Sequence, residues 1–307
     1  MRIVFFGTPA FAVPSLEALL AERAQVVGVV TQPDKPRGRS RSTLLPPAVK
    51  EFAERHRLPV MQPSRPAGDV FLAALRHWQP ELGVVVAYGH ILPIEVLTLP
   101  TRGMINVHAS LLPQLRGAAP INRAILEGHR ETGITIMQME TGMDAGPILR
   151  QVATPIGPNE TAGALTERLA RLGAETLIEA LALLRLGRLP PQPQHHAGAT
   201  FAPKLDRTIT RIEWAESAAQ VVRRIRAFDP VPGAWTELDG REVKFFSAKP
   251  EAGAGAPGEV LAGGETLLIA TGVGAIAVGE VQPAGKARMT GAEWIRGRGI
   301  CVGARLT

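Results

Sequence analysis

The first two-thirds of the chain alternates short apolar runs with helical patterns, and this alternation limits the fold more than any other feature. Helical patterns begin near Pro14 and Pro46, and proline suits the first turn of a helix. One apolar run holds three consecutive valines, which is typical of a strand buried on both faces. The alternation predicts an α/β fold with an open, mostly parallel, doubly wound sheet. The predicted strands are Arg2–Phe6, Val26–Val30, Leu82–Ala87, Met104–His108 and Gly133–Met139.

The pattern changes after a long helical stretch at Ala162–Leu186. Residues 190–203 are rich in proline and small side chains, as in a linker. Beyond them, a helical pattern at Ala218–Phe228 precedes short strand-like pieces separated by glycines, which is typical of a small β-barrel or sandwich. The 307 residues give room for about two domains. We therefore expect one domain over 1–189 and a smaller one over 204–307.

Composition excludes several classes of protein. A single cysteine, Cys301, excludes a disulfide scaffold and a zinc site with several cysteines. No apolar run approaches the roughly 20 residues that span a bilayer, and the N-terminal MRIVFFGTPAF lacks the pattern of a signal peptide. We therefore expect a soluble, cytoplasmic protein. The net charge of +6 is too small to indicate a nucleic-acid partner by itself.

Four cations lie within seven residues of one loop, just after the second predicted strand, with glycine and serine between them. One interpretation is a solvated charge run. The other is a flexible clamp for phosphates, because arginine offers planar, bidentate donors. The residues are Lys35, Arg37, Arg39 and Arg41.

Polar side chains gather where a buried strand ends. Asn106 and His108 have the i, i+2 spacing that places two side chains on the same face of a strand. The carboxyl ends of parallel strands are where open α/β sheets bind their ligands. Asp144 lies on a loop between Gly142 and Gly146, where an acid is often only a turn residue. Together the three would supply an amide donor, a general acid or base, and a carboxylate beside the imidazole.

At this point the sequence resembles a known family, the folate-dependent formyltransferases. The block INVHASLLPQLRGAAPI carries the resemblance, with VVAYGHILP before it and GITIMQMETGMDAGPIL after it. Further similar strings are FFGTPAFAVPSLEAL, VVTQPDKPRGRS, FAPKLDRTITRIEW, RRIRAFDPVPGAWTEL and QPAGKARMTGAEWIRGRG, so the similarity runs nearly from end to end. It implies a Rossmann-like formyltransferase domain at 1–189, a linker at 190–203, and a C-terminal OB-like β-barrel at 204–307 that binds tRNA.

The resemblance also implies roles for residues at matching positions. Asn106, His108 and Asp144 match the catalytic trio of the family. The basic loop matches an insertion that reaches the tRNA, and Arg39 matches the arginine of its Gly-Arg pair. The loop that touches the folate is matched by Ser110, Leu111, Leu112 and Pro113, and the tRNA-binding residues by Lys35, Arg37, Arg39 and Arg41.

Two stretches depart from the family pattern. Gln114 and Leu115 stand where an Arg-Trp pair is common, and Asp229-Pro230-Val231 replaces a commoner Asn-Pro-Trp. Both flank the motifs, so the departures put local packing or a tRNA contact in doubt and leave the trio intact.

The reaction that the resemblance implies is transfer of a formyl group from 10-formyltetrahydrofolate to the α-amino group of initiator methionyl-tRNA, by a monomer that needs no metal. Relatives that formylate a glycinamide nucleotide or an amino-sugar nucleotide, or that hydrolyse the folate, share the same trio. The basic loop and the C-terminal domain favour a macromolecular acceptor. A second class of function, an RNA-binding module without activity, is disfavoured because the trio is complete.

Overall fold

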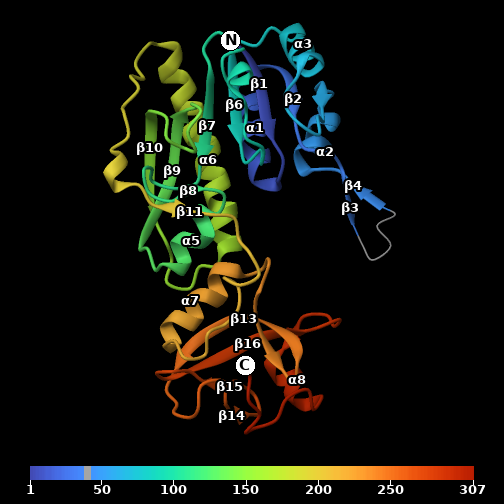
Figure 1. The fold of residues 1–307 in the computed structure, drawn as a ribbon, viewed down its shortest axis with the longest axis vertical. Coiled ribbons are helices and arrows are strands. Elements are labelled where there is room, and N and C mark those ends of the chain that lie inside the picture. The colour runs from blue at the N-terminus through green and yellow to red at the C-terminus, as the bar shows by residue number, and fades with distance from the viewer. Residues whose placement is uncertain (38–42) are drawn as a thin grey trace. The chain divides into compact units, whose positions relative to one another are not determined.

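The structure, a computed structural model, describes residues 1–37 and 43–307. The described chain forms two compact units, drawn in Figure 1. Unit 1 consists of Met1–Pro120, Thr132–Pro155 and Thr166–Pro203. Unit 2 consists of Ile121–Glu131, Ile156–Leu165 and Lys204–Thr307. Unit 2 thus includes two short segments that precede the C-terminal segment in the sequence.

A seven-stranded sheet forms the centre of unit 1, with its strands in the order β10-β9-β7-β6-β1-β2-β5. Within this order, each pair of adjacent strands from β7 through β6, β1 and β2 to β5 is parallel, which confirms the predicted mostly parallel sheet. Strand β9 instead runs antiparallel to β7. The bounds are β1 (Arg2–Gly7), β2 (Gln25–Val30), β5 (Val60–Met61), β6 (Leu82–Val86), β7 (Met104–His108), β9 (Glu131–Gln138) and β10 (Ile148–Pro155).

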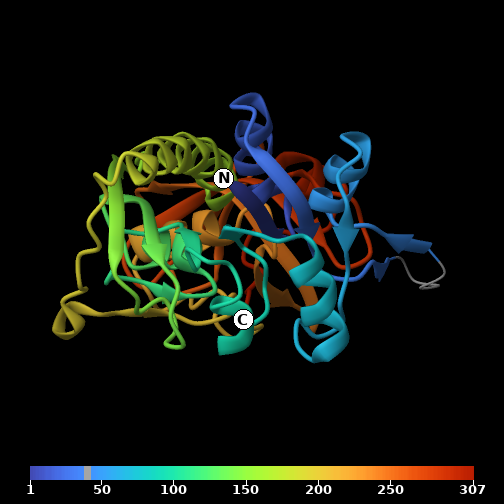
Figure 2. The ribbon, with the colours of Figure 1, turned by 90° about the horizontal axis from the view of Figure 1, so that it is seen from above.

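Helices cover both faces of this sheet: α1 and α6 lie on one face, and α3 and α4 on the other (Figure 2). The side chains of Val84 and Val86 are consequently fully buried, as the run of valines predicts. Among the described residues, no helix has both the length and the apolar character needed to cross a membrane. The helical segments are η1 (Ala10–Ala12), α1 (Val13–Ala21), α2 (Ala48–Arg55), α3 (Asp69–His77), α4 (Ile94–Leu97), α5 (Pro120–Leu126), α6 (Ala162–Arg185) and η2 (His196–Gly198).

The strand order reverses beside β1: the chain continues outward through β2 on one side and resumes with β6 on the other. Open α/β sheets bind ligands at such a reversal, outside the carboxyl ends of the strands. Three strands, β1, β6 and β7, therefore point their carboxyl ends toward the region where a ligand is expected.

Unit 2 is built on an antiparallel sheet in the order β12-β13-β16-β15-β14, with β17 paired to β16. Its core is aromatic, since the rings of Trp214 and Trp294 both meet Phe245 edge to face. The predicted short strands of the C-terminal segment all fall within this sheet. Its elements are α7 (Ala218–Phe228), β12 (Ala234–Leu238), β13 (Arg241–Glu251), β14 (Val260–Gly263), β15 (Leu267–Ala270), β16 (Ala275–Pro283), β17 (Met289–Thr290) and α8 (Gly291–Arg296).

Residues 190–203, the expected linker, pack onto unit 1. Gln192 forms a β-bridge with Ile148. Farther along, β11 (Phe201–Ala202) pairs in parallel with β8 (Arg116–Gly117). The segment therefore runs against the part of unit 1 that follows the predicted catalytic strand.

Candidate active site

The structure brings Asn106, His108 and Asp144 together at the carboxyl end of β7. Asn106 Nδ2 lies 3.4 Å from Asp144 Oδ1, and His108 Nδ1 lies 3.7 Å from Asp144 Oδ2. The His108 side chain is 6% exposed and that of Asp144 is 19% exposed. Both donor distances exceed the usual 2.9 Å or so of an N–H···O bond. The amide and the ring are thus aimed at the carboxylate without being locked to it.

The other ring nitrogen of His108 has a backbone partner. His108 Nε2 lies 3.0 Å from the carbonyl oxygen of Leu115. A carbonyl oxygen only accepts hydrogen bonds, so this contact requires a proton on Nε2. A second proton, on Nδ1, would face the Asp144 carboxylate. Each ring nitrogen of His108 therefore lies near an oxygen that can accept a hydrogen bond.

Leu115 matters here through its backbone, although it departs from the family pattern. Its φ of +58° is in the left-handed region, which is uncommon for a bulky residue and typical of functional sites. Its N–H donates to Thr200 Oγ1 at 2.9 Å, and its side chain is buried. Because His108 contacts the backbone carbonyl of Leu115, having leucine here in place of the tryptophan common in the family does not remove this contact.

A backbone N–H also holds the carboxylate of Asp144. The Gly117 N–H donates to Asp144 Oδ2 at 2.8 Å. Gly117 has a φ of +116°, and a Cβ atom there would lie 2.7 Å from the carbonyl oxygen of Ala202. Only glycine fits this conformation without strain. The small residues noted in the sequence thus allow a backbone donor to approach the acid.

The predicted folate loop is ordered by hydrogen bonds to its own backbone and to β9. Ser110 is fully buried, and its Oγ donates to the carbonyl oxygen of Gln114 at 2.6 Å. Thr135 Oγ1 donates to the carbonyl oxygen of Ser110 at 2.6 Å and accepts from the Leu112 N–H at 3.1 Å. Leu112 is buried, while Leu111 and Pro113 are partly exposed. The hydroxyl of Ser110 is therefore engaged within the loop.

A cavity of about 500 Å³ lies beside the predicted catalytic strand in unit 1. Gln138, which lines it, pairs with Ile105, the neighbour of Asn106 in β7. The lining combines apolar side chains with amide, hydroxyl and carboxylate groups, which is the usual composition of a small-molecule site. The lining residues are Ile94, Leu97, Thr98, Pro100, Thr101, Gly103, Gln138, Met139, Glu140 and Thr141.

Polar side chains that the sequence did not single out also gather at the carboxyl edge of the sheet. The carbonyl oxygen of Tyr88 accepts from Thr8 Oγ1 at 2.8 Å and from Gln32 Nε2 at 3.0 Å. Gln62 donates to Asp34 at 2.6 Å, and Lys50 forms an ion pair with the same carboxylate. The Gln62 hydrogen bond and then the Lys50 ammonium lower the pKa of Asp34.

The basic loop is only partly within the described residues. Lys35 is exposed and lies with Arg37 in β3 (Lys35–Arg37), which pairs antiparallel with β4 (Thr43–Leu45). This β3–β4 ribbon projects from the sheet (Figure 1). Arg39 and Arg41, also predicted to bind tRNA, lie outside the described residues.

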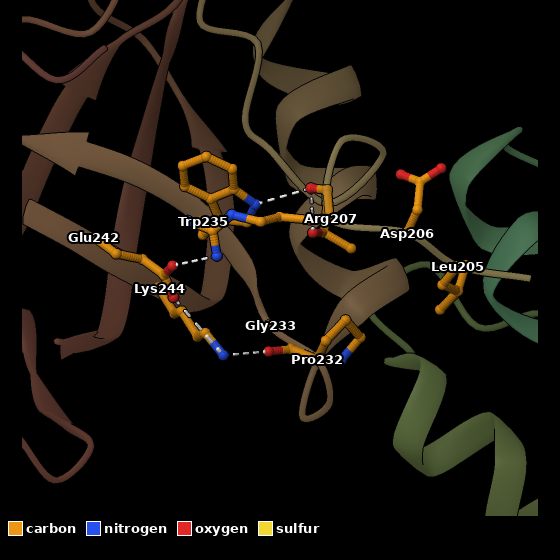
Figure 3. A pocket seen from close by; sticks show the side chains of 9 residues that line it. Leu205, Asp206, Arg207, Pro232, Gly233, Trp235, Glu242 and Lys244 are labelled. Carbon is orange, nitrogen blue, oxygen red and sulfur yellow. Dashed lines mark hydrogen bonds and ion pairs between the residues drawn. The ribbon is translucent and has the colours of Figure 1, made fainter. Parts of the chain in front are cut away.

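Unit 2 carries a hollow of about 300 Å³ of its own, shown in Figure 3. The guanidinium of Arg207 lies 4.0 Å from the centre of the Trp235 ring and forms a 2.6 Å ion pair with Glu242. Lys244 Nζ donates to the carbonyl oxygen of Pro232 at 2.8 Å. Acidic and basic groups therefore lie together in the hollow, and the Arg207 side chain is 64% exposed.

Gln194 is the main residue of the site that sequence reasoning missed. Its amide contacts the loop that carries Asp144, yet it lies in a proline-rich stretch interpreted as a linker. No periodicity marks it, because its role depends on a contact across 50 residues. Among the described residues, no group of three or more histidine, cysteine or acidic side chains could hold a metal ion.

Comparison with known proteins relates both the N-terminal and the C-terminal part of the chain to one family. Residues 1–181 match the formyl transferase family, and residues 204–299 match the formyl transferase C-terminal domain. A methionyl-tRNA formyltransferase of Magnetococcus marinus is 47% identical, with 99% of this chain and 98% of that protein covered. The one from Thermus thermophilus is 46% identical, with 100% and 99% covered.

Solved structures show the same fold. HypX from Aquifex aeolicus in complex with tetrahydrofolic acid matches with a TM-score of 0.69 and 24% identity, over 96% of this chain and 47% of that one. Methionyl-tRNA formyltransferase from Clostridium thermocellum matches with a TM-score of 0.57 and 15% identity, over 81% and 93% of the two chains. By its sequence along nearly its whole length, this chain belongs to the formyl transferase family.

Proposed function

We propose that this chain transfers the formyl group of 10-formyltetrahydrofolate to the α-amino group of methionyl-tRNA, with Asn106, His108 and Asp144 as its catalytic residues. The observation that carries the proposal is the meeting of these three side chains at the carboxyl end of β7. The relatives named methionyl-tRNA formyltransferase, similar over nearly full length, support this acceptor.

The attacking amine must be neutral. An α-amino group has a pKa of about 7.7–8.0, so a useful fraction is neutral near pH 7. Asn106 Nδ2 and His108 Nδ1 then donate to the formyl oxygen, where negative charge develops as the amine adds. Donors of this kind act most strongly when they are fixed in advance, and both lie in a mostly buried site.

The proton balance gives His108 and Asp144 their roles. The bond from the formyl carbon to the amine forms, the bond from that carbon to folate N10 breaks, one proton leaves the amine and one arrives at N10. His108 would relay this proton from the amine to N10, because a histidine side chain can gain and lose a proton near neutral pH. Asp144 would orient the ring, because its Oδ2 lies 3.7 Å from His108 Nδ1.

We place the pteridine of the donor in the cavity between α4 and the end of β9, beside the amino-terminal part of β7. It is large enough for a fused ring, and it combines the apolar side chains of Leu97 and Met139 with the polar side chain of Gln138. Ser110, Leu111, Leu112 and Pro113 would hold the donor through their fixed backbone. Bound there, the donor supplies an activated one-carbon unit.

The tRNA would be held mainly by charge. Lys35 and Arg37 on the β3–β4 ribbon, with Arg39 and Arg41, would contact phosphates, and residues 204–307 would form a second contact as a tRNA-binding domain. We assign the chemistry to residues 1–189, with 190–203 as the connection. The protein would act as a cytoplasmic monomer on initiator tRNA in translation initiation.

The test is transfer of labelled formyl from 10-formyltetrahydrofolate to methionyl-tRNA, with initiator and elongator tRNA in parallel and an amino-sugar nucleotide as the alternative acceptor. The proposal predicts label on methionyl-tRNA, initiator above elongator. Label on the sugar nucleotide alone would contradict the acceptor. The molecular mass of the pure protein, measured by sedimentation, tests the prediction that it is a monomer.

A further inference from the structure

The side-chain amide of Gln194 is 5% exposed and connects two parts of the active site. Its Nε2 donates to the carbonyl oxygens of Asp144 at 2.8 Å and of Gly146 at 2.7 Å. Its Oε1 accepts from Arg116 Nη2 at 2.6 Å and from Arg116 Nε at 3.2 Å. Both hydrogens and both lone pairs of the amide are therefore used.

The first of these contacts falls on a residue whose backbone must be held. Asp144 has a φ of +46°, in the left-handed region. Such a conformation costs free energy and persists only where the surroundings fix it. Gln194 holds the carbonyl of Asp144, while the Gly117 N–H holds its carboxylate. The direction of the carboxylate toward Asn106 and His108 depends on both contacts.

The second contact reaches the segment that carries this N–H. Arg116 is buried, precedes Gly117 in β8, and has His196 Nδ1 as a further partner at 3.0 Å. By holding Arg116, Gln194 also fixes the position of the Gly117 donor. The Gln194 amide thus connects the loop that carries Asp144 to strand β8, which carries the Gly117 N–H.

We propose that Gln194 is a positioning residue for formyl transfer, acting through Asp144 and Gly117, so that residues 190–203 complete the active site and do not merely connect two domains. This inference rests on the proposed function. Its consequence is that changes at Gln194 lower kcat and leave the KM for both substrates nearly unchanged, because the amide directs the carboxylate and contacts neither substrate.

Two substitutions separate the contacts. Gln194→Glu keeps the size of the side chain and an acceptor for Arg116, but removes the donors to Asp144 and Gly146. Gln194→Ala removes all four hydrogen bonds. Gln192→Ala is the matched control, since Gln192 is an exposed glutamine in the same segment whose backbone pairs with Ile148.

The kinetic test compares these variants in two backgrounds. Displacement of a reacting group by about 1 Å can cost on the order of 100-fold, so we expect Gln194→Glu and Gln194→Ala to lower kcat about 10- to 100-fold, with Gln192→Ala like the wild type. With Asp144→Ala already present, Gln194→Ala should cost less than about twofold more, because nothing is left to position. An equal loss in both backgrounds would overturn the proposal.

A spectroscopic test needs no activity. In the NMR spectrum of the full chain, the Gly117 amide should shift in Gln194→Ala and Gln194→Glu in the same direction as in Asp144→Ala, and should stay unchanged in Gln192→Ala. An unchanged Gly117 amide in both Gln194 variants would overturn the proposal. If Gly117 responds as expected but the wild type transfers no formyl group to methionyl-tRNA, the positioning contact stands and the proposed function fails.

Discussion

The surroundings of Asp144 and the β3–β4 ribbon present charge in opposite ways. At Asp144, the Gly117 N–H fixes the carboxylate, the Gln194 amide holds the backbone carbonyl, and the neighbouring His108 is almost fully buried. On the ribbon, Lys35 is exposed, and the strand pair projects from the sheet. Bond-making needs a fixed geometry, whereas attraction of a polyanion needs accessible charge. The two regions should therefore respond to mutation in different kinetic parameters.

The largest effect should follow removal of a trio side chain. Asn106→Ala, His108→Ala and Asp144→Ala should each lower kcat about 100- to 1,000-fold, because each removes a group that stabilises charge or moves a proton in the transition state. Steady-state transfer at saturating substrates measures this, and circular dichroism checks that each variant is folded. An Asp144→Ala enzyme with wild-type turnover would remove that residue from the mechanism.

Gly117→Ala should be the next most damaging change. The added Cβ would lie 2.7 Å from the carbonyl oxygen of Ala202, at a φ of +116°. The backbone must shift, so its N–H moves away from Asp144 and kcat should fall at least about tenfold. Gly187→Ala, with a φ of +64° and nothing within 4 Å of the added Cβ, controls for conformational strain alone. Equal activity of the two variants would show that the Gly117 N–H does not position the Asp144 carboxylate for catalysis.

Changes on the ribbon should act on tRNA affinity. Replacing Lys35, Arg37, Arg39 and Arg41 with alanine should raise the KM for tRNA about tenfold or more at physiological salt and leave kcat nearly unchanged. The slope of log affinity against log salt should become shallower by about 0.7–0.9 for each tRNA phosphate that the variant no longer neutralises. Measuring tRNA affinity of the wild type and the variant across a series of salt concentrations gives these slopes. Identical slopes would mean that the four cations are a solvated charge run that does not bind tRNA.

The smallest effect is expected in unit 2. Arg207→Ala should raise the KM for tRNA about two- to threefold, because Arg207 is exposed but its charge is offset by Glu242. Arg207→Lys, which keeps the charge and loses the planar stack on Trp235, should lie between wild type and alanine. An unchanged KM for tRNA in Arg207→Ala would show that tRNA does not bind at this hollow.

Much of unit 1 could be predicted from sequence because its signals are local. Runs such as Leu82–Val86 are buried on both faces, and Asn106 and His108 follow from the alternation of side chains along one strand. The direction of β9 was not predictable, since an apolar run does not say which way a strand pairs. The helix α3 was also not predicted.

The contacts that hold the trio lay beyond sequence reasoning for a different reason. The donor to Asp144 is a backbone N–H, the acceptor for His108 is a backbone carbonyl, and Gln194 is distant in sequence. Backbone groups are present at every residue and carry no sequence signal, and a single glutamine has no periodicity. Only the folded chain brings them to the site.

The most direct test of the proposed reaction is transfer of labelled formyl from 10-formyltetrahydrofolate to initiator methionyl-tRNA by the wild type and by His108→Ala, at saturating substrates. We expect efficient transfer by the wild type and a loss of about 100-fold or more in the variant. Absence of label on methionyl-tRNA with the wild type, or equal turnover of the two proteins, would contradict it.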